Sequence, residues 1–517
     1  MEMEPIAQFD ELYSISDLHM GGATPARQIF DQGPLLAAWI GGLTKKKVTT
    51  NGLALVINGD MVDFLAEDGA TYFDPEGAVK KLSRIAKDAS FKPVWDALRE
   101  FVKTPQRQLI VTMGNHDLEL SLPWVREALL TTLSNGEAAA RGRITLQMDG
   151  GGYRCRVGAA SVYCVHGNDV DSWNLTDYEH LRRLGRDLWQ GLNIEPWVPN
   201  AGTQLVIDVM NAIKHKFAFV DLLKPENEAV IPVLAALDTS AVNHQNLDSA
   251  IGVARRLTWD KVRRRLGFLS AGQGESAPQH APGAMLADVL QNSPVLSSAI
   301  AKSSVKAPQQ KAQQQDVVQQ LLNNAHNALK GQAPATGAKP AEEFLGLGSA
   351  IVSLFKGKSK SEVLRSYLQE LKDDQSFEIT HADETFERTD ETISANIDIV
   401  ITGHTHQEKA LRRRGGGMYY NSGTWVRLIQ LEDDVLDSDT QFAKAFDAFS
   451  NGSMTVLDQC QAPPLVKRKP AFVSIVNENG VTKAFLNHVE PVANKEPVAN
   501  KPNATTFSVV PGSEFSR

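Results

Sequence analysis

Residues 53–63 read LALVINGDMVD, a run of aliphatic residues that ends in polar, turn-forming ones. So short an apolar run is typical of a strand that is buried on both faces of a parallel sheet. Similar runs occur at LYSIS (12–16), QLIVT (108–112), SVYCV (161–165) and IDIVI (397–401). Residues 26–42 and 78–103 have helical spacing of apolar positions and are long enough to cross over a parallel sheet. The sequence therefore predicts an α/β layer architecture.

Each of these runs is followed by residues that can bind a metal ion. The following segments are Asp17-Leu18-His19, Asn58-Gly59-Asp60, Gly114-Asn115-His116-Asp117, His166-Gly167 and Gly403-His404-Thr405-His406. Ligands of open α/β sheets bind outside the carboxyl ends of the strands, so we expect these side chains to converge. Carboxylate, amide and imidazole groups without a thiolate suit manganese, iron, zinc or similar ions. A carboxylate can also bridge two cations about 3.5 to 4 Å apart, and the number of candidate ligands favours two metals.

The order of these motifs resembles that of a known family. DLH (17–19), GDMVD (59–63), GNHD (114–117), VHGN (165–168) and GHTH (403–406) resemble the five motifs of the calcineurin-like metallophosphoesterases. The resemblance covers roughly the first 170 residues and a block near 395–430. It implies a four-layer α-β-β-α sandwich and hydrolysis of a phosphoester by a hydroxide held between two metal ions. A non-catalytic scaffold on the same fold is the alternative.

The resemblance also implies a ligand set for each metal. The first ion would be held by Asp17, His19, Asp60 and His406. The second would be held by Asp60, Asn115, His166 and His404, so that Asp60 bridges the two. We expect two divalent ions, with manganese preferred over iron, zinc, nickel or cobalt.

Three further residues receive catalytic roles from the resemblance. His116 would hydrogen-bond the phosphate or protonate the leaving oxygen, and Asp117 would orient it. Asp63 would support the ligands from outside, so its loss should cost less than the loss of Asp60. The fourth motif has Asn168 where many relatives have Asp, which predicts altered substrate contacts. The second and third motifs favour a phosphodiesterase or pyrophosphatase over a protein phosphatase.

The motifs divide the chain into a catalytic domain that a long insertion splits. We expect core segments at 8–170 and 394–489, a helical insertion or cap at 171–393, a Gln-rich linker at about 270–340, and a disordered repetitive tail at 490–517. The linker contains QQKAQQQDVVQQ, a composition that buries too little apolar surface to order itself. The tail begins with two copies of EPVANK.

Composition limits the partners that the chain can have. A net charge of −8 argues against a general nucleic-acid binder. Three cysteines without a CxxC pair, no basic leader and no apolar run of about 18 residues predict a cytoplasmic protein without a transmembrane segment. We expect a phosphorylated small-molecule or nucleotide-type substrate. A nucleic-acid end stays an alternative, as does a lipid-linked substrate reached through the apolar segment 342–357, and the oligomeric state stays open.

Arginine clusters are the candidates for binding a polyanionic substrate. They are Arg182-Arg183, Arg255-Arg256, Arg263 to Arg265 and Arg412 to Arg414. Such clusters are usually solvated faces, and the sharper hypothesis is that at least one of them binds the substrate phosphate.

Overall fold

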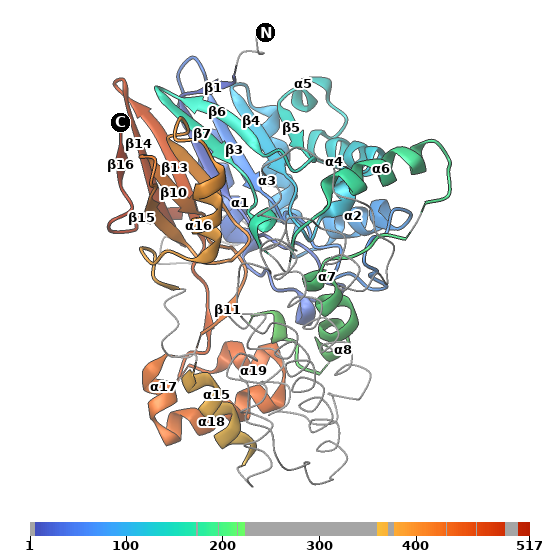
Figure 1. Ribbon diagram of the computed structural model, residues 1–517, viewed down its shortest axis with the longest axis vertical. Coiled ribbons are helices and arrows are strands. Elements are labelled where there is room, and N and C mark those ends of the chain that lie inside the picture. The colour runs from blue at the N-terminus through green and yellow to red at the C-terminus, as the bar shows by residue number, and fades with distance from the viewer. Residues whose placement is uncertain are drawn as a thin grey trace, which may run out of the picture.

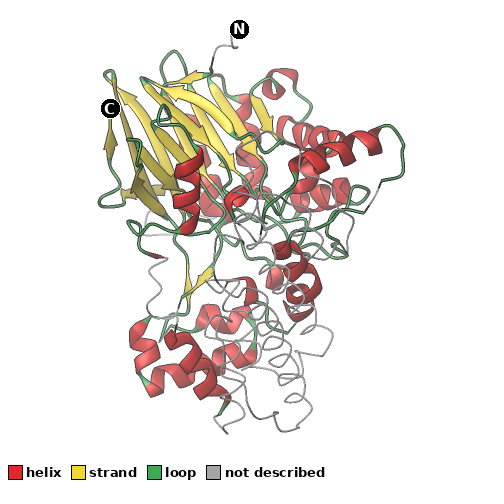
Figure 2. Ribbon diagram, viewed as in Figure 1, coloured by secondary structure: helices red, strands yellow, loops and turns green. Residues whose placement is uncertain are grey.

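The computed structural model is a sandwich of two β-sheets covered by helices (Figures 1 and 2). It describes residues 6–171, 174–194, 196–214, 216–222, 359–370, 377–430, 432–461, 463–491 and 505–517. The predicted Gln-rich linker and the apolar segment 342–357 lie outside these residues. Among the described helices, none combines the length and the apolar character that crossing a membrane requires.

The larger sheet has eight strands, seven of them in the order β15-β14-β13-β2-β3-β4-β5, with β16 also paired to β14. Strands β2 to β5 are parallel, whereas β13, β14 and β15 run antiparallel to their neighbours. The strands are β2 (Glu11–Ile15), β3 (Leu53–Asn58), β4 (Arg107–Thr112), β5 (Ile144–Gln147), β13 (Ala471–Glu478), β14 (Val481–Pro491), β15 (Thr505–Val509) and β16 (Phe515–Ser516).

The smaller sheet has six strands in the order β1-β6-β7-β8-β10-β9. Its central strands β7, β8 and β10 are parallel, so their carboxyl ends lie at one edge. The strands are β1 (Gln8–Phe9), β6 (Tyr153–Val157), β7 (Ala160–Cys164), β8 (Ile399–Thr402), β9 (Lys409–Arg412) and β10 (Met418–Asn421). A separate pair consists of β11 (Leu428–Ile429) and β12 (Val466–Lys467).

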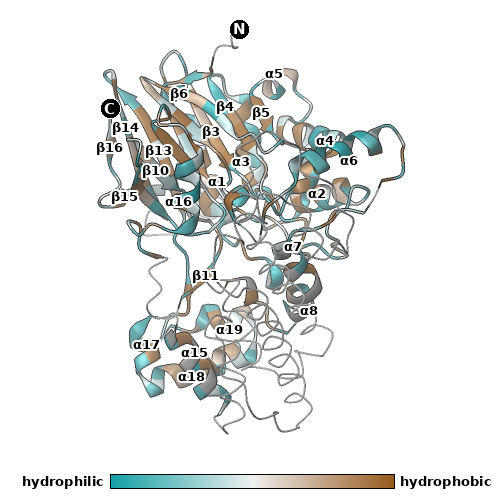
Figure 3. Cartoon of the chain, in the orientation of Figure 1, coloured by the Kyte–Doolittle hydropathy of each residue, from teal (hydrophilic) through white to brown (hydrophobic). Residues whose placement is uncertain are grey.

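Alternating side chains on the central strands fill two different cores. On β3, Ala54 and Val56 face the smaller sheet, whereas Leu55 and its alternate neighbours face the helices. On β8, Ile399 and Ile401 join the core between the sheets, and Val400 packs on the outer side with Phe386. The apolar colour of the central strands in Figure 3 reflects this burial on both faces. The predicted four-layer α-β-β-α sandwich is confirmed.

Helices form the outer layers and a group at one end of the molecule. In Figure 1 the group of α15, α17, α18 and α19 lies below the sandwich, beyond β11. The helices are α1 (Gly33–Lys45), α2 (Ala78–Lys87), α3 (Lys92–Lys103), α4 (Pro123–Ser134), α5 (Ala138–Arg141), α6 (Tyr178–Trp189), α7 (Ala201–Leu205), α8 (Asn211–Lys214), α15 (Lys360–Glu370), α16 (Glu384–Thr392), α17 (Asp433–Asp437), α18 (Asp439–Asn451) and α19 (Met454–Gln459). Short 3-10 helices cover Pro25–Arg27, Leu118–Ser121, Asn168–Val170 and Val220–Leu222, and a π-helical turn covers Val206–Met210.

The two predicted crossover helices differ from the structure at identifiable residues. The helix expected over 26–42 begins only at Gly33, because Pro34 favours the first helical turn and cannot sit deeper in a helix. The helix expected over 78–103 breaks into α2 and α3. At the break the Asp88 carboxylate accepts a hydrogen bond from the Ser90 backbone N–H, and Pro93 lies in the first turn of the next helix.

The prediction of a disordered tail is wrong for residues 505–517. Strand β15 pairs antiparallel with β14 from Thr505 to Val509, and Phe515 at the start of β16 is buried between the sheets. Thr505–Val509 is rich in β-branched and aromatic residues, which favour a strand. The EPVANK repeats beyond Pro491 lie outside the described residues.

The described parts of the predicted insertion contain helices and no strand. One of them, α16, packs its Phe386 ring against Tyr419 of the smaller sheet with ring centres 5.1 Å apart. This helix is therefore the outer layer of the sandwich rather than part of a cap.

Candidate metal centre

The polar segments after β2, β3, β4, β7 and β8 converge at one edge of the sandwich. Asp17 follows β2 in the larger sheet, and its carboxylate accepts a hydrogen bond from the backbone N–H of His404, which follows β8 in the smaller sheet. The two N–O distances are 3.1 and 3.0 Å. Residues far apart in the sequence thus meet because the carboxyl ends of both sets of parallel strands lie at the same edge of the sandwich.

The first ligand group consists of Asp17, His19 and His406, all buried. His19 Nε2 lies 3.0 Å from His406 Nε2, and the Asp17 carboxylate oxygen lies 3.4 Å from the same His406 nitrogen. Two buried imidazole nitrogens and a buried carboxylate oxygen so close together form a donor set that suits a divalent cation.

Asp60 lies between His19 of this first group and His166. Its Oδ2 atom is 3.5 Å from His19 Nε2 and 3.1 Å from His166 Nε2, while its Oδ1 atom accepts the backbone N–H of His116 at 2.9 Å. Burial alone would raise the pKa of the Asp60 carboxyl, but the neighbouring imidazoles, His166 first, hold it below its ordinary value. The Asp60 carboxylate is thus shared by the His19 and His166 imidazoles.

Asn115 and His404 are the other two predicted ligands on the His166 side of Asp60. The ring of His404 lies 5.4 Å from that of His166, centre to centre. Asn115 is buried and its Oδ1 atom has no hydrogen-bond partner in the described structure. A buried amide oxygen without a partner costs free energy, and a cation at this place would satisfy it. The buried carboxylate, imidazole and amide donors here therefore suit a divalent cation.

The backbone at these ligands is strained. Asp17, His19, Asp60, His404 and His406 all have left-handed backbone conformations, with φ between 44° and 71°. Such conformations are uncommon outside glycine and persist only where the surrounding structure enforces them. Their concentration at five candidate ligands marks this edge of the sandwich as a functional site.

Gly59 shows why a small residue must precede Asp60. Its φ is 85°, and a Cβ atom there would lie 2.2 Å from Nδ1 of His166. Any larger residue would push the imidazole away. The Nδ1 atom of His166 lies 2.9 Å from the carbonyl oxygen of Asn58, which leaves Nε2 toward Asp60.

His116 lies beside the first group and contacts Asp63 rather than Asp117. His116 Nδ1 is 3.2 Å from Asp63 Oδ2, and the same oxygen is 3.1 Å from Nδ1 of His19. Burial raises the pKa of the Asp63 carboxyl, but His116 and His19 outweigh it and hold the pKa well below the ordinary range. One carboxylate thus positions both a candidate ligand and the candidate acid.

Asp117 has a different place from the one expected. Its carboxylate accepts hydrogen bonds from the backbone N–H groups of Gly114 at 2.7 Å and Met61 at 2.9 Å. Asp117 therefore connects the loop after β4 to the loop after β3. The carboxylate beside the His116 ring is that of Asp63. Burial and the Asp60 charge raise the pKa of the Asp117 carboxyl to about 8.

Residues 12–221 match the model of the calcineurin-like phosphoesterase family. This part of the chain is a calcineurin-like phosphoesterase domain. Searches of curated proteins and of solved structures give no match to the chain. The family is metal-dependent, and the domain supplies candidate ligands of the kind that such hydrolases need.

The match leaves His404 and His406 outside the calcineurin-like phosphoesterase domain. The structure nevertheless places both against its ligands, because β8 pairs with β7.

Some residues around the candidate metal centre have no counterpart in the sequence prediction. Asn421 donates a hydrogen bond to the Gly403 carbonyl at 2.6 Å, and the Thr424 hydroxyl donates one to the Asp17 carbonyl at 2.9 Å. These residues belong to the segment Asn421-Ser422-Gly423-Thr424 after β10. This segment directly follows the apolar run of β10, and polar residues after an apolar run are also the signal that predicts the ligands.

Two of the described arginines form ion pairs within the protein. Arg413 is buried and pairs with Asp390, whereas Arg182 pairs with Glu179 on the surface of α6. The clusters at 255–256 and 263–265 lie outside the described residues.

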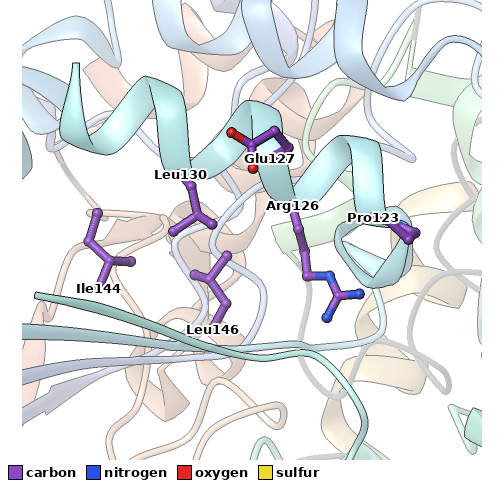
Figure 4. Close-up of a pocket in the computed structure, with 6 residues that line it drawn as sticks. All are labelled: Pro123, Arg126, Glu127, Leu130, Ile144 and Leu146. Atoms are coloured by element: carbon purple, nitrogen blue, oxygen red, sulfur yellow. The ribbon is translucent and has the colours of Figure 1, made fainter. Parts of the chain in front are cut away.

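A groove on the calcineurin-like phosphoesterase domain lies between α4 and β5 (Figure 4). Leu130, Ile144 and Leu146 line it together with Pro123, Arg126 and Glu127. None of the candidate ligands lines this groove, so it is separate from the metal centre.

Proposed function

We propose that the protein is a hydrolase that cleaves a phosphodiester or pyrophosphate bond with two divalent cations. The observation that carries the proposal is the position of the Asp60 carboxylate between the His19 and His166 imidazoles, at 3.5 and 3.1 Å. Asp17, His19, Asp60 and His406 would hold the first ion, and Asp60, Asn115, His166 and His404 the second. Two such ions lower the pKa of bound water and neutralise phosphate charge.

The chain itself would supply the proton for the leaving group. Asp63 contacts Nδ1 of His116 and so fixes the orientation of the ring. We assign Nε2 as the atom that gives a proton to the leaving oxygen, or a hydrogen bond to the phosphate. The backbone N–H of His116 donates to Asp60, so the acid is tied to the shared ligand by its own main chain.

The start of the predicted cap supports a small substrate. Asn211 of α8 donates a hydrogen bond at 3.0 Å to the carbonyl of Leu65, two residues after Asp63. Helix α7 packs against Asn174, which contacts Asn115. Elements that cover the crevice exclude water and select substrates by size, which favours a phosphorylated small molecule or nucleotide over a phosphoprotein.

We assign manganese as the preferred ion, since the ligand set has oxygen and imidazole donors without a thiolate. We also place the protein in the cytoplasm. The described cysteines Cys155, Cys164 and Cys460 are free, and unpaired thiols are usual in a reducing compartment.

The test is metal-dependent turnover by the purified full chain. The protein is stripped of metal with a chelator, reloaded with Mn²⁺, Zn²⁺ or Co²⁺, and assayed on chromogenic phosphomonoesters, phosphodiesters and pyrophosphates. We expect Mn²⁺ to restore hydrolysis of a diester or pyrophosphate.

The matched variants are Asp60→Ala and Asp68→Asn. Asp60→Ala should lose metal and activity together, whereas Asp68 is an exposed carboxylate of the same region, paired with Arg27, and its change should alter neither. A wild-type chain that binds metal and hydrolyses no phosphoester would overturn the proposal in favour of a scaffold.

A further inference from the structure

The side chain of Asn168, in the fourth motif after β7, is buried and holds residues of the segment that follows it. Asn168 is buried, and its Nδ2 group donates hydrogen bonds to the Asn174 carbonyl at 3.1 Å and to the Thr176 hydroxyl at 3.2 Å. Its Oδ1 atom accepts the Tyr178 hydroxyl at 3.3 Å. An ionised aspartate has no donor for the first two bonds. Asn168 therefore holds residues 174, 176 and 178 in place through its side chain.

Asn174, which Asn168 holds, and the nearby Asp171 contact two candidate ligands. Asp171 Oδ2 lies 2.8 Å from Nε2 of His404 and also accepts a hydrogen bond from Nδ2 of Asn174 at 2.7 Å. The Oδ1 atom of Asn174 accepts from Nδ2 of Asn115 at 3.5 Å. The relay of Asp171 and Asn174 thus connects a ligand after β8 with a ligand after β4.

These contacts set the orientation of both ligands. A carboxylate on Nε2 of His404 places the ring proton there, so that Nδ1 has the lone pair that a cation requires. A bond from the Asn115 amide nitrogen directs its Oδ1 atom to the opposite side, where that oxygen has no hydrogen-bond partner in the described structure. His404 and Asn115 are the ligands assigned only to the second ion, together with His166.

Helix α7 approaches the same relay. A Cβ atom on Gly202, in the first turn of α7, would lie 2.0 Å from Oδ1 of Asn174. Only glycine permits this approach. Arg388 of α16 donates to the carbonyl of Val170 at 3.1 Å, so the segment is also attached to the outer layer of the smaller sheet.

We propose that Asn168, Asp171 and Asn174 are positioning residues that control the affinity of the second metal site without affecting the first. The inference rests on the proposed function, because it assumes that the ligand set holds two ions. Because Gly202 packs against Asn174, the position of α7 is linked to the second metal site. Binding of the second ion and the position of α7 should therefore affect each other.

The experiment is a Mn²⁺ titration of the metal-free full chain by calorimetry, with wild type compared to Asp171→Ala, Asn174→Ala and Asn168→Asp. We expect two sites in the wild type. In each variant the first site should keep its affinity, while the second should weaken by about 10- to 100-fold. Visible absorption of the Co²⁺-loaded protein should show the same selective loss of the second equivalent.

The control is Asp177→Asn in the same segment. Asp177 caps α6 by accepting the His180 backbone N–H at 2.9 Å, and asparagine caps equally well. Within the described part of the chain, Asp177 has no hydrogen bond to a candidate ligand. This variant should titrate like the wild type.

Several outcomes separate the two proposals. A wild-type chain with fewer than two sites would overturn the proposed dinuclear function itself. Two wild-type sites with an unchanged second site in all three variants would overturn only the positioning role. An equal loss at both sites would also overturn it, because the segment would then support the whole fold.

Discussion

Replacing Asp63 by asparagine tests how one carboxylate serves two imidazoles. Asp63 is buried, and its Oδ2 atom lies 3.1 Å from Nδ1 of His19 and 3.2 Å from Nδ1 of His116. Its Oδ1 atom accepts the Ala66 backbone N–H at 2.9 Å. Asp63→Asn can keep the bond to Ala66, but it replaces the acceptor of both imidazoles with an NH₂ donor.

The magnitude follows from the two contacts. The hydrogen bond of His19 to the charged carboxylate is worth about 1.5 to 3 kcal/mol, and the ion-pair contact of His116 is assigned the same range, so losing both costs about 3 to 6 kcal/mol. At about 1.4 kcal/mol per factor of ten, kcat/KM should fall by about 10²- to 10⁴-fold. The His19 contact should appear as weaker binding of the first ion, and the His116 contact as a lower kcat at saturating Mn²⁺.

The assay is steady-state hydrolysis of a chromogenic diester over a range of Mn²⁺ concentrations, with the metal content measured on the same samples. Saturating Mn²⁺ should recover only the part of the loss that comes from His19. Full recovery of kcat would show that Asp63 does not orient His116, and a loss as complete as that of Asp60→Ala would show that Asp63 is itself a ligand.

Three other perturbations have distinct expected results. His116→Ala keeps the backbone N–H that bonds Asp60, so metal content should stay unchanged while kcat falls by about 10²- to 10⁴-fold, and an empty protein in metal analysis would contradict its role as an acid. Glu119 is buried, and burial raises the pKa of its carboxyl from 4.5 to about 7, so the free energy of unfolding should decrease by about 3 kcal/mol as pH rises from 4.5 to 7. Glu119→Gln keeps the oxygen that accepts the Asp74 N–H, and its denaturant unfolding should lack this pH-dependent loss; an unchanged slope would refute the assignment. Removing Mn²⁺ that is present at 100 times its Kd should cost about 2.7 kcal/mol for each site, and equal melting temperatures with and without chelator would contradict metal binding to the folded chain.

The central strands and the candidate ligands were predictable from the sequence because both are local signals. A strand buried on both faces, such as Leu53–Asn58, reads as a continuous apolar run, and the ligands stand directly after such runs. Strand β14 was not predicted, because its buried and exposed residues largely alternate and no ligand motif follows it. The Asp88 side chain that ends α2 and the pairing of β15 with β14 depend on contacts that spacing along the chain does not record.

The residues around the ligands were harder to predict for a related reason. Asp171 and Asn174 act on His404 and Asn115, which come from two different sheets. No spacing within the sequence predicts such a contact, because it exists only after β7 and β8 have paired. The assignment of Asp117 to His116 relied on adjacency in the chain, whereas the partner in space is Asp63, more than fifty residues earlier.

The strained backbone at the candidate ligands requires contacts from both parts of the core. A left-handed residue costs of order 1 to 3 kcal/mol, and five of them can persist only if strong contacts hold them. Those contacts cross between the sheets: His404 N–H donates to Asp17, and Asn421 holds the loop of Gly403. Strand β13, from the last part of the chain, pairs with β2, which ends just before Asp17. Residues 12–221 therefore supply most of the ligands, but the second part of the core is needed to hold them in their strained conformations.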